Sequence, residues 1–175
     1  MRAVFILAAA MLASACSADG TNSFDGTEVV TSGKTEVAIA EVPSDVLAAA
    51  SQRVADLKLT EAETELRNGV RYYDLGGSLP DGSEMELDIM QDGASWRVVE
   101  TQRDLDFTAV PRPVADAALA SDPGLKPTRV IESRQEDGLV IYELFSPAGS
   151  DPVGAKKEVR WDGKRAEVLT SEWVH

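Results

Sequence analysis

An internal repeat most restricts what this chain can fold into. Short motifs recur in the same order at a spacing of 68 to 70 residues. The first copy holds Val42-Pro43, Glu63, Gly69, Tyr73 and Asp92-Gly93, and the second holds Val110-Pro111, Glu132, Gly138, Tyr142 and Asp162-Gly163. Because a fixed period marks a repeated supersecondary unit, and small drifts in spacing fit loop insertions, we expect two copies of one folding unit.

Each copy has the pattern of one helix followed by four strands. A Val-Pro pair precedes an Ala-rich stretch with apolar residues at helical spacing, which predicts short amphipathic helices near residues 44–54 and 113–120. Alternating or β-branched runs then predict strands over 57–66, 70–79, 83–90 and 96–102, and over 128–134, 139–146, 155–161 and 165–173. Asn-Gly and Asp-Gly pairs between these runs favour tight hairpin turns, since these residues tolerate positive φ.

Strand 83–90 indicates how each unit should pack. Its apolar residues alternate with acids, so we expect the apolar face to meet the helix and the acidic face to meet water. The apolar residues are Met85, Leu87 and Ile89, and the acids are Glu84, Glu86 and Asp88. The predicted fold class is α+β, with two tandem units over 42–107 and 108–175, each one helix packed on a four-stranded antiparallel β-meander.

This succession of a Val-Pro helix and strands ending in Asp-Gly turns resembles the PepSY-like fold, including its tandem form in β-lactamase-inhibitor-like proteins. The resemblance covers the chain from Val42 to its end. It implies a small secreted or lipid-anchored periplasmic module that binds or restrains proteins, such as proteases, without catalysis.

The first residues have the pattern of a signal peptide. Arg2 precedes an apolar run over 4–12, and small residues follow over 13–15. The run is too short to span a hydrocarbon core of about 30 Å. Residues 12–16, ending in Cys16, resemble the lipobox of bacterial lipoproteins, which implies cleavage after residue 15 and acylation of Cys16. An ordinary secretory peptide cleaved at the same place is the alternative.

Residues 16–41 are predicted to form the lipidated N-terminus and a flexible tether, because they are rich in Ser, Thr, Gly and Asp. Ser17 follows Cys16 in place of the Asp that resembles an inner-membrane retention signal. The resemblance therefore implies an anchor in the outer membrane, facing the periplasm. Two or more acyl chains on one residue give a stable anchor.

The composition excludes several classes of chemistry. Cys16 is the only cysteine and His175 the only histidine, so the chain has no intrachain disulfide, no Cys-rich zinc site and no histidine away from its last residue for a catalytic triad. His175 is interpreted as a terminal residue, not as a ligand. Seventeen basic against thirty acidic residues give a formal charge of −13, which disfavours nucleic acid as a partner.

Three interpretations are open for the acidic residues of strand 83–90 and for the pair Asp104 and Asp106. They are interpreted first as a solvated face, because their period of two places them on the outer side of a meander. Calcium binding is an alternative for Asp104 and Asp106, although the sequence lacks a D-x-D-x-D-G loop with a closing Glu. Catalysis by an acidic pair is another and requires two close, buried carboxylates. We expect no metal and no cofactor.

Two interpretations are also open for the positions of the aromatic side chains. Tyr73, Trp96, Tyr142 and Trp161 either fill the cores or lie exposed on a helix-free sheet face, where they are the candidate partner-binding residues. Tyr72 and Tyr73 point to opposite sides of one strand, so one of them is expected in a core.

These observations predict a non-catalytic, lipid-anchored protein of the cell envelope that binds a periplasmic protein or peptide, inhibition being one form of such binding. The alternative is a structural or assembly lipoprotein of the outer membrane without a defined ligand pocket.

Overall fold

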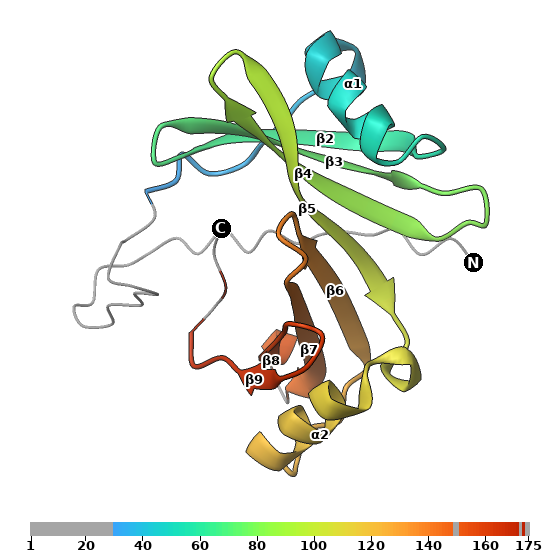
Figure 1. Ribbon diagram of the computed structural model, residues 1–175, viewed down its shortest axis with the longest axis vertical. Coiled ribbons are helices and arrows are strands. Elements are labelled where there is room, and N and C mark those ends of the chain that lie inside the picture. The colour runs from blue at the N-terminus through green and yellow to red at the C-terminus, as the bar shows by residue number, and fades with distance from the viewer. Residues whose placement is uncertain (1–29, 149–150, 172, 174–175) are drawn as a thin grey trace.

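The computed structural model describes residues 30–148, 151–171 and 173, and within them the strands form one antiparallel sheet in the order β1 to β9 (Figure 1). The strands are β1 (Thr35–Glu36), β2 (Lys58–Arg67), β3 (Val70–Ser78), β4 (Glu84–Asp92), β5 (Ser95–Leu105), β6 (Arg129–Gln135), β7 (Val140–Ala148), β8 (Asp151–Trp161) and β9 (Ala166–Val168). The helices are α1 (Ser44–Arg53) and α2 (Arg112–Ser121), each preceded by a short 3₁₀ turn, η1 (Ile39–Glu41) or η2 (Phe107–Ala109).

The helices and the hairpin turns form where the sequence predicts them. Each α-helix starts directly after the Pro of a Val-Pro pair, at Pro43 and Pro111. Gly69, Gly93, Gly138 and Gly163 all have positive φ at the predicted turns. The strands that these turns connect therefore pair as neighbours along the chain.

The predicted fold class of two tandem units, each one helix on its own four-stranded meander, is wrong, because the strands form one nine-stranded sheet in which β5 joins both halves. β5 pairs with β4 up to Glu86↔Gln102 and with β6 from Glu100↔Gln135 to Leu105↔Val130. β5 continues past residue 102, where the sequence pattern predicted its end. Its outer edge pairs with β6, the first strand of the second copy. Two separate meanders would each have left this edge unpaired, and an unpaired edge is a site of unwanted association.

Both helices lie on the same face of this sheet. Leu87 pairs with Thr101, and Leu105 pairs with Val130, so these four side chains share one face under the period of two. α1 packs on β4 and β5, whereas α2 packs on β8 and β9 (Figure 1). One sheet thus carries two hydrophobic cores, one under each helix.

The first core confirms the alternation predicted for strand 83–90. Leu87 and Ile89 are fully buried beneath α1, with Val46 and Ala50 of the helix, and Met85 is partly buried beside them. The second core repeats the scheme with Val114 and Ala118 of α2 against strands β6 to β8. The repeat in the sequence therefore encodes two helix-on-sheet cores, but not two sheets.

The turn of the first hairpin has one more residue in the second copy than in the first. This difference exchanges the two faces of β6 relative to those of the matching strand β2. Asn68-Gly69 forms a two-residue turn between Arg67 and Val70, with positive φ at both positions. The second copy uses a three-residue turn, 136–138, closed by a hydrogen bond from the Gln135 N–H to the Leu139 carbonyl. Because one residue of slip exchanges the two faces of a strand, the matched Glu63 and Glu132 point to opposite faces of the sheet.

Candidate binding groove and buried charge clusters

The four candidate aromatic residues lie on the helix-bearing face. Tyr73 and Trp96 pack edge to face, with ring centroids 5.3 Å apart and planes at 69°, against the first core. Trp161 packs against the second core, and Tyr142 is buried in it with 3% of its surface exposed. Of the two interpretations, exposure on the helix-free face is wrong, and packing against the cores describes these four residues.

Tyr72 takes the helix-free face in place of Tyr73. Its ring is buried beneath the Arg67 guanidinium, whose central carbon lies 4.5 Å from the ring centroid. The predicted alternation of the two tyrosines is therefore confirmed, with Tyr73 on the core side.

A groove lies beside α1, over strands β4, β5 and β6 in the middle of the sheet. It consists of a cavity of about 360 Å³ beside α1 and a second of about 290 Å³, and both are lined by Thr101 and Arg134. Two ten-residue helices, each about 10 Å wide, do not cover nine strands spaced about 4.8 Å apart, so the centre of the sheet remains open. We call this feature the central groove.

The floor of the central groove is organised around Glu132, whose side chain is only 3% exposed. Arg134 binds this carboxylate through two nitrogens, at 2.9 Å and 3.1 Å, and Arg103 Nε donates to Oε2 at 2.6 Å. The Tyr142 hydroxyl donates to Oε1 at 3.0 Å. These four hydrogen bonds fix the two arginines, whose side chains remain about half exposed at the groove.

The electrostatics of this Glu132 cluster follow from its composition. Burial alone would raise the pKa of Glu132, but hydrogen bonds from Arg103, Arg134 and Tyr142 bring it below its ordinary value. Burial and the neighbouring Glu132 raise the pKa of Tyr142 to about 12. Glu132 is therefore ionised at neutral pH and Tyr142 is a neutral donor.

The α1 side of the groove carries two further arginines. Arg97 NH1 lies 2.8 Å from Glu136, and Arg53 stands exposed at the end of α1. Within the described residues, Arg53 has no ion-pair partner. The Trp96 indole and Ala49 of α1 supply apolar surface in the same cavity, so the groove is amphipathic.

The helix-free face carries a second cluster, formed around Lys34. Lys34 Nζ lies 2.7 Å from Asp74 Oδ2, 3.5 Å from Glu63 and 3.7 Å from Glu86. Asp74 is paired across the strands with Asp88, and both are 3% exposed. Lys34 reaches these acids from the segment that pairs with the edge of β2, because β1 directly follows it.

Arg67 supplies the second cation of this Lys34 cluster. Its Nε and NH2 both lie 2.6 Å from Glu65 Oε1, and its NH1 lies 3.5 Å from Asp88. Thr31 Oγ1 donates to the other oxygen of Glu65 at 2.5 Å. The cluster therefore brings five carboxylates against two cations, which leaves an excess of negative charge under the described segment 30–36.

The prediction that the acids of strand 83–90 form a solvated face is wrong for Asp88 and Glu86. Burial and the neighbouring Asp88 raise the pKa of Asp74 to about 7 and that of Glu86 to about 8. Burial would lower the pKa of Lys34, but Asp74, Glu86 and Asp88 raise it above its ordinary value. Carboxyl groups on adjacent strands cannot all ionise at low cost, so Asp74 and Glu86 bind and release protons near neutral pH.

This arrangement supplies the close, buried carboxylates that catalysis by an acidic pair would need. Oxygen atoms of Asp74, Glu86 and Asp88 lie within 4.8 Å of one another, a spacing at which carboxylates can also hold a cation. The Lys34 ammonium already stands against Asp74, the most buried member. In the described structure the positive charge at this position thus comes from the chain itself.

Asp104 and Asp106, the alternative calcium pair, lie in different local surroundings. Asp104 on β5 binds Arg129 Nε at 3.0 Å, whereas Asp106 precedes η2. The remaining candidates, Cys16 and His175, lie outside the described residues, as does the signal segment 1–15. Among the described residues, neither helix has the length and apolar character needed to cross a membrane.

The sequence did not predict Arg103, Arg134 and Glu132 as residues of the candidate site. Arg134 and Glu132 are two apart in one strand, which was a signal that they share a face. Which face they share depends on the length of the 136–138 turn, and that Arg103 joins them depends on the β5–β6 register. Lys34 was missed because it falls in the segment interpreted as a tether.

Comparison with known proteins adds no family to this description: no protein-family model matches the chain, and no curated protein matches its sequence.

Proposed function

We propose that the protein is a non-catalytic binding module of the cell envelope, which holds a segment of a partner protein or peptide in the central groove. In this proposal acylated Cys16 anchors the chain at the periplasmic face of the outer membrane, and residues 17–29 lie between the anchor and the sheet. The protein needs no cofactor for this role.

The observation that carries the proposal is the central groove itself, with two cavities joined at Thr101 and Arg134. It combines an aromatic side chain, Trp96, with exposed arginines, and Trp and Arg are enriched among residues that dominate protein interfaces. Buried Glu132 fixes two of these arginines before any partner arrives, which lowers the ordering cost of binding.

The experiment is site-specific photocrosslinking in cells that produce the full chain. A photoreactive amino acid replaces Gln52, which lines the groove on α1, and the matched control carries it at exposed Lys164 in the β8–β9 turn. We expect a discrete crosslinked protein from position 52 and none from position 164. The same product from both positions, or none from position 52, contradicts the proposal and favours a structural lipoprotein without a ligand pocket.

The anchor is tested separately by changing Cys16→Ser and following the protein through membrane fractionation and intact-mass analysis. We expect the parent protein in the outer-membrane fraction with the mass of a lipid on Cys16, and the variant in the soluble fraction. A parent protein without added lipid mass contradicts the anchor but leaves the groove proposal standing.

A further inference from the structure

We propose that the central groove recognises an acidic peptide segment, whose carboxylates bind Arg103 and Arg134 on the sheet and Arg53 on α1. This inference rests on the function proposed above and names the chemistry of the partner. The chain as a whole has a formal charge of −13, yet four arginines line this groove: Arg53, Arg97, Arg103 and Arg134. A basic groove on an acidic protein is suited to steer and orient an anionic partner.

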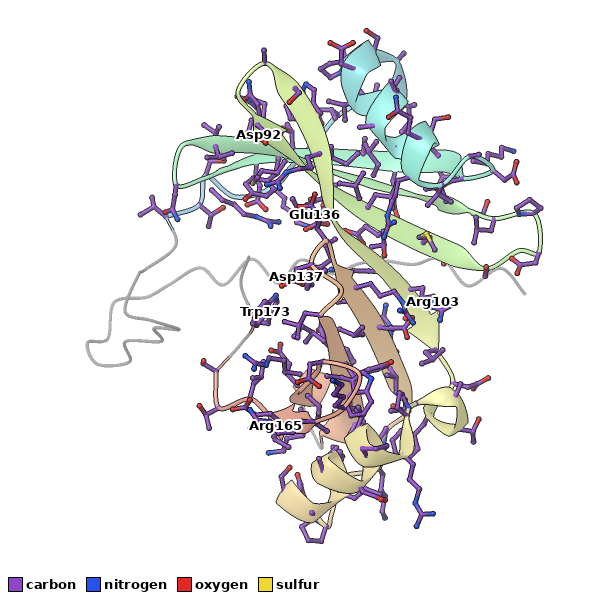
Figure 2. All side chains as sticks on the ribbon, in the orientation of Figure 1. Asp92, Arg103, Glu136, Asp137, Arg165 and Trp173 are labelled. Carbon is purple, nitrogen blue, oxygen red and sulfur yellow. The ribbon has the colours of Figure 1, made fainter. Side chains whose placement is uncertain are left out.

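The acids near the groove do not cancel this charge. Glu100 lines one cavity, but its side chain points to the helix-free face, where it accepts a hydrogen bond from Gln135 at 2.7 Å. Glu136 pairs with Arg97, and Glu132 is shared by Arg103 and Arg134. Arg97 pairs with Met90 on the neighbouring strand, as Tyr72 does, so its side chain also points to the helix-free face. Arg53, Arg103 and Arg134 thus stand against Glu132, which leaves a net positive groove (Figure 2 labels Arg103 and Glu136).

Arg103 is positioned to bind a carboxylate of the partner. Glu132 contacts its Nε, and within the described residues its two terminal nitrogens have no hydrogen-bond partner. These nitrogens form the outward edge of a planar fork, which suits a carboxylate. Because Glu132 also holds Arg134 through two bonds, the two guanidinium groups are presented together.

Arg53 supplies a separate contact across the groove, since it belongs to α1 and lines only the first cavity. Apolar side chains also line each cavity, Trp96 and Val98 the first and Met85 the second. The segment that fits is therefore short, with acidic side chains that flank an apolar one.

The experiment measures the binding of two peptides to the full chain purified in a neutral detergent. Both peptides have blocked, uncharged termini and carry a neutral dye. One peptide contains Glu-Leu-Glu between Gly-Ser flanks, and the other contains Gln-Leu-Gln. At pH 7 and low salt we expect the Glu peptide to bind at least about tenfold more tightly than the Gln peptide, and to weaken as salt is added.

Three variants locate the site. Arg53→Gln, which breaks no ion pair within the described structure, should weaken the Glu peptide about fivefold, and Arg103→Gln with Arg134→Gln should weaken it about 25-fold. Arg165→Gln, at an exposed arginine in the β8–β9 turn, is the matched control and should change nothing. If the double variant fails to fold, Arg53→Gln decides the question. In that variant Glu132 still has both of its arginine partners, so the fold is not disturbed there.

The outcomes separate this inference from the proposed function. Equal binding of the two peptides, or unchanged binding after Arg53→Gln, overturns the acidic ligand. If photocrosslinking from position 52 still yields a partner, the groove binds a protein of other chemistry and the proposed function stands. Arginine-dependent binding to vesicles with anionic lipid, without binding of the Glu peptide, also overturns it and assigns the groove to a membrane surface.

Discussion

Two clusters, one in each half of the sheet, bury carboxylates in opposite ways. In the first half, Asp74, Glu86 and Asp88 meet on the helix-free face around Lys34, and acids outnumber cations. In the second half, Glu132 lies on the helix-bearing face between two arginines. Burial raises the pKa of Asp74 and Glu86, whereas hydrogen bonds from cationic donors lower the pKa of Glu132.

This contrast separates two consequences of burying an acid. When burial brings like charges together, the carboxyl group favours its proton and the cluster responds to pH near neutrality. When burial brings enough donors, the carboxylate stays charged and orients its partners, as Glu132 does for Arg103 and Arg134. The first arrangement is suited to holding a segment of the chain in a pH-dependent way, and the second to building a rigid binding surface.

The largest expected effect comes from removing the cation of the first cluster. Lys34→Met leaves Asp74 without its closest positive partner, which should cost about 3 kcal/mol at pH 8. At pH 5 the loss should be smaller, because Asp74 and Glu86 are then protonated. Unfolding by urea at both pH values measures this, with exposed Lys164→Met as the control; equal losses at pH 5 and pH 8 would contradict the ion pair as the cause.

The pH dependence of the parent protein distinguishes the two clusters directly. Between about pH 4 and pH 8 the unfolded chain releases the protons of Asp74 and Glu86 while the folded protein retains them, so rising pH favours unfolding. Glu132 acts in the opposite direction, but only below its ordinary pKa range. We therefore expect a loss on the order of 1 to 2 kcal/mol between pH 5 and pH 8.

Glu86→Gln should flatten this profile, because it removes one of the two carboxyl groups whose pKa is raised. The measurement is the urea unfolding midpoint of parent and variant across the pH range. A parent protein that becomes more stable from pH 5 to pH 8 would contradict the assignment of the first cluster.

The smallest effect tests a single bond in the second cluster. Tyr142→Phe removes the hydroxyl that donates to Glu132 at 3.0 Å and should cost about 1 kcal/mol in thermal or urea unfolding. Tyr73→Phe is the control, because it retains the ring that packs on Trp96, and should be close to neutral. Equal costs for the two variants would mean that the Tyr142 hydroxyl contributes nothing specific to the arrangement of Glu132.

Local patterns were sufficient to predict the helices, the turns and the core face of strand 83–90. Val-Pro pairs start both helices, Gly residues at the turns have positive φ, and Leu87 and Ile89 are buried as the alternation requires. The same alternation did not show that Asp88 would be covered. Whether an outward residue meets water depends on Lys34 and Arg67, which approach from elsewhere in the chain.

By itself, the sequence determined the repeat, the elements and the residues that can form each core, because these depend on neighbours in the chain and on periods of two and 3.6 residues. Only the tertiary structure decided that β5 joins the copies into one sheet, that Asp74 and Asp88 are buried and that Arg103 and Arg134 meet on one carboxylate. These outcomes depend on strand register and on the length of one turn, where a single residue exchanges the two faces of a strand.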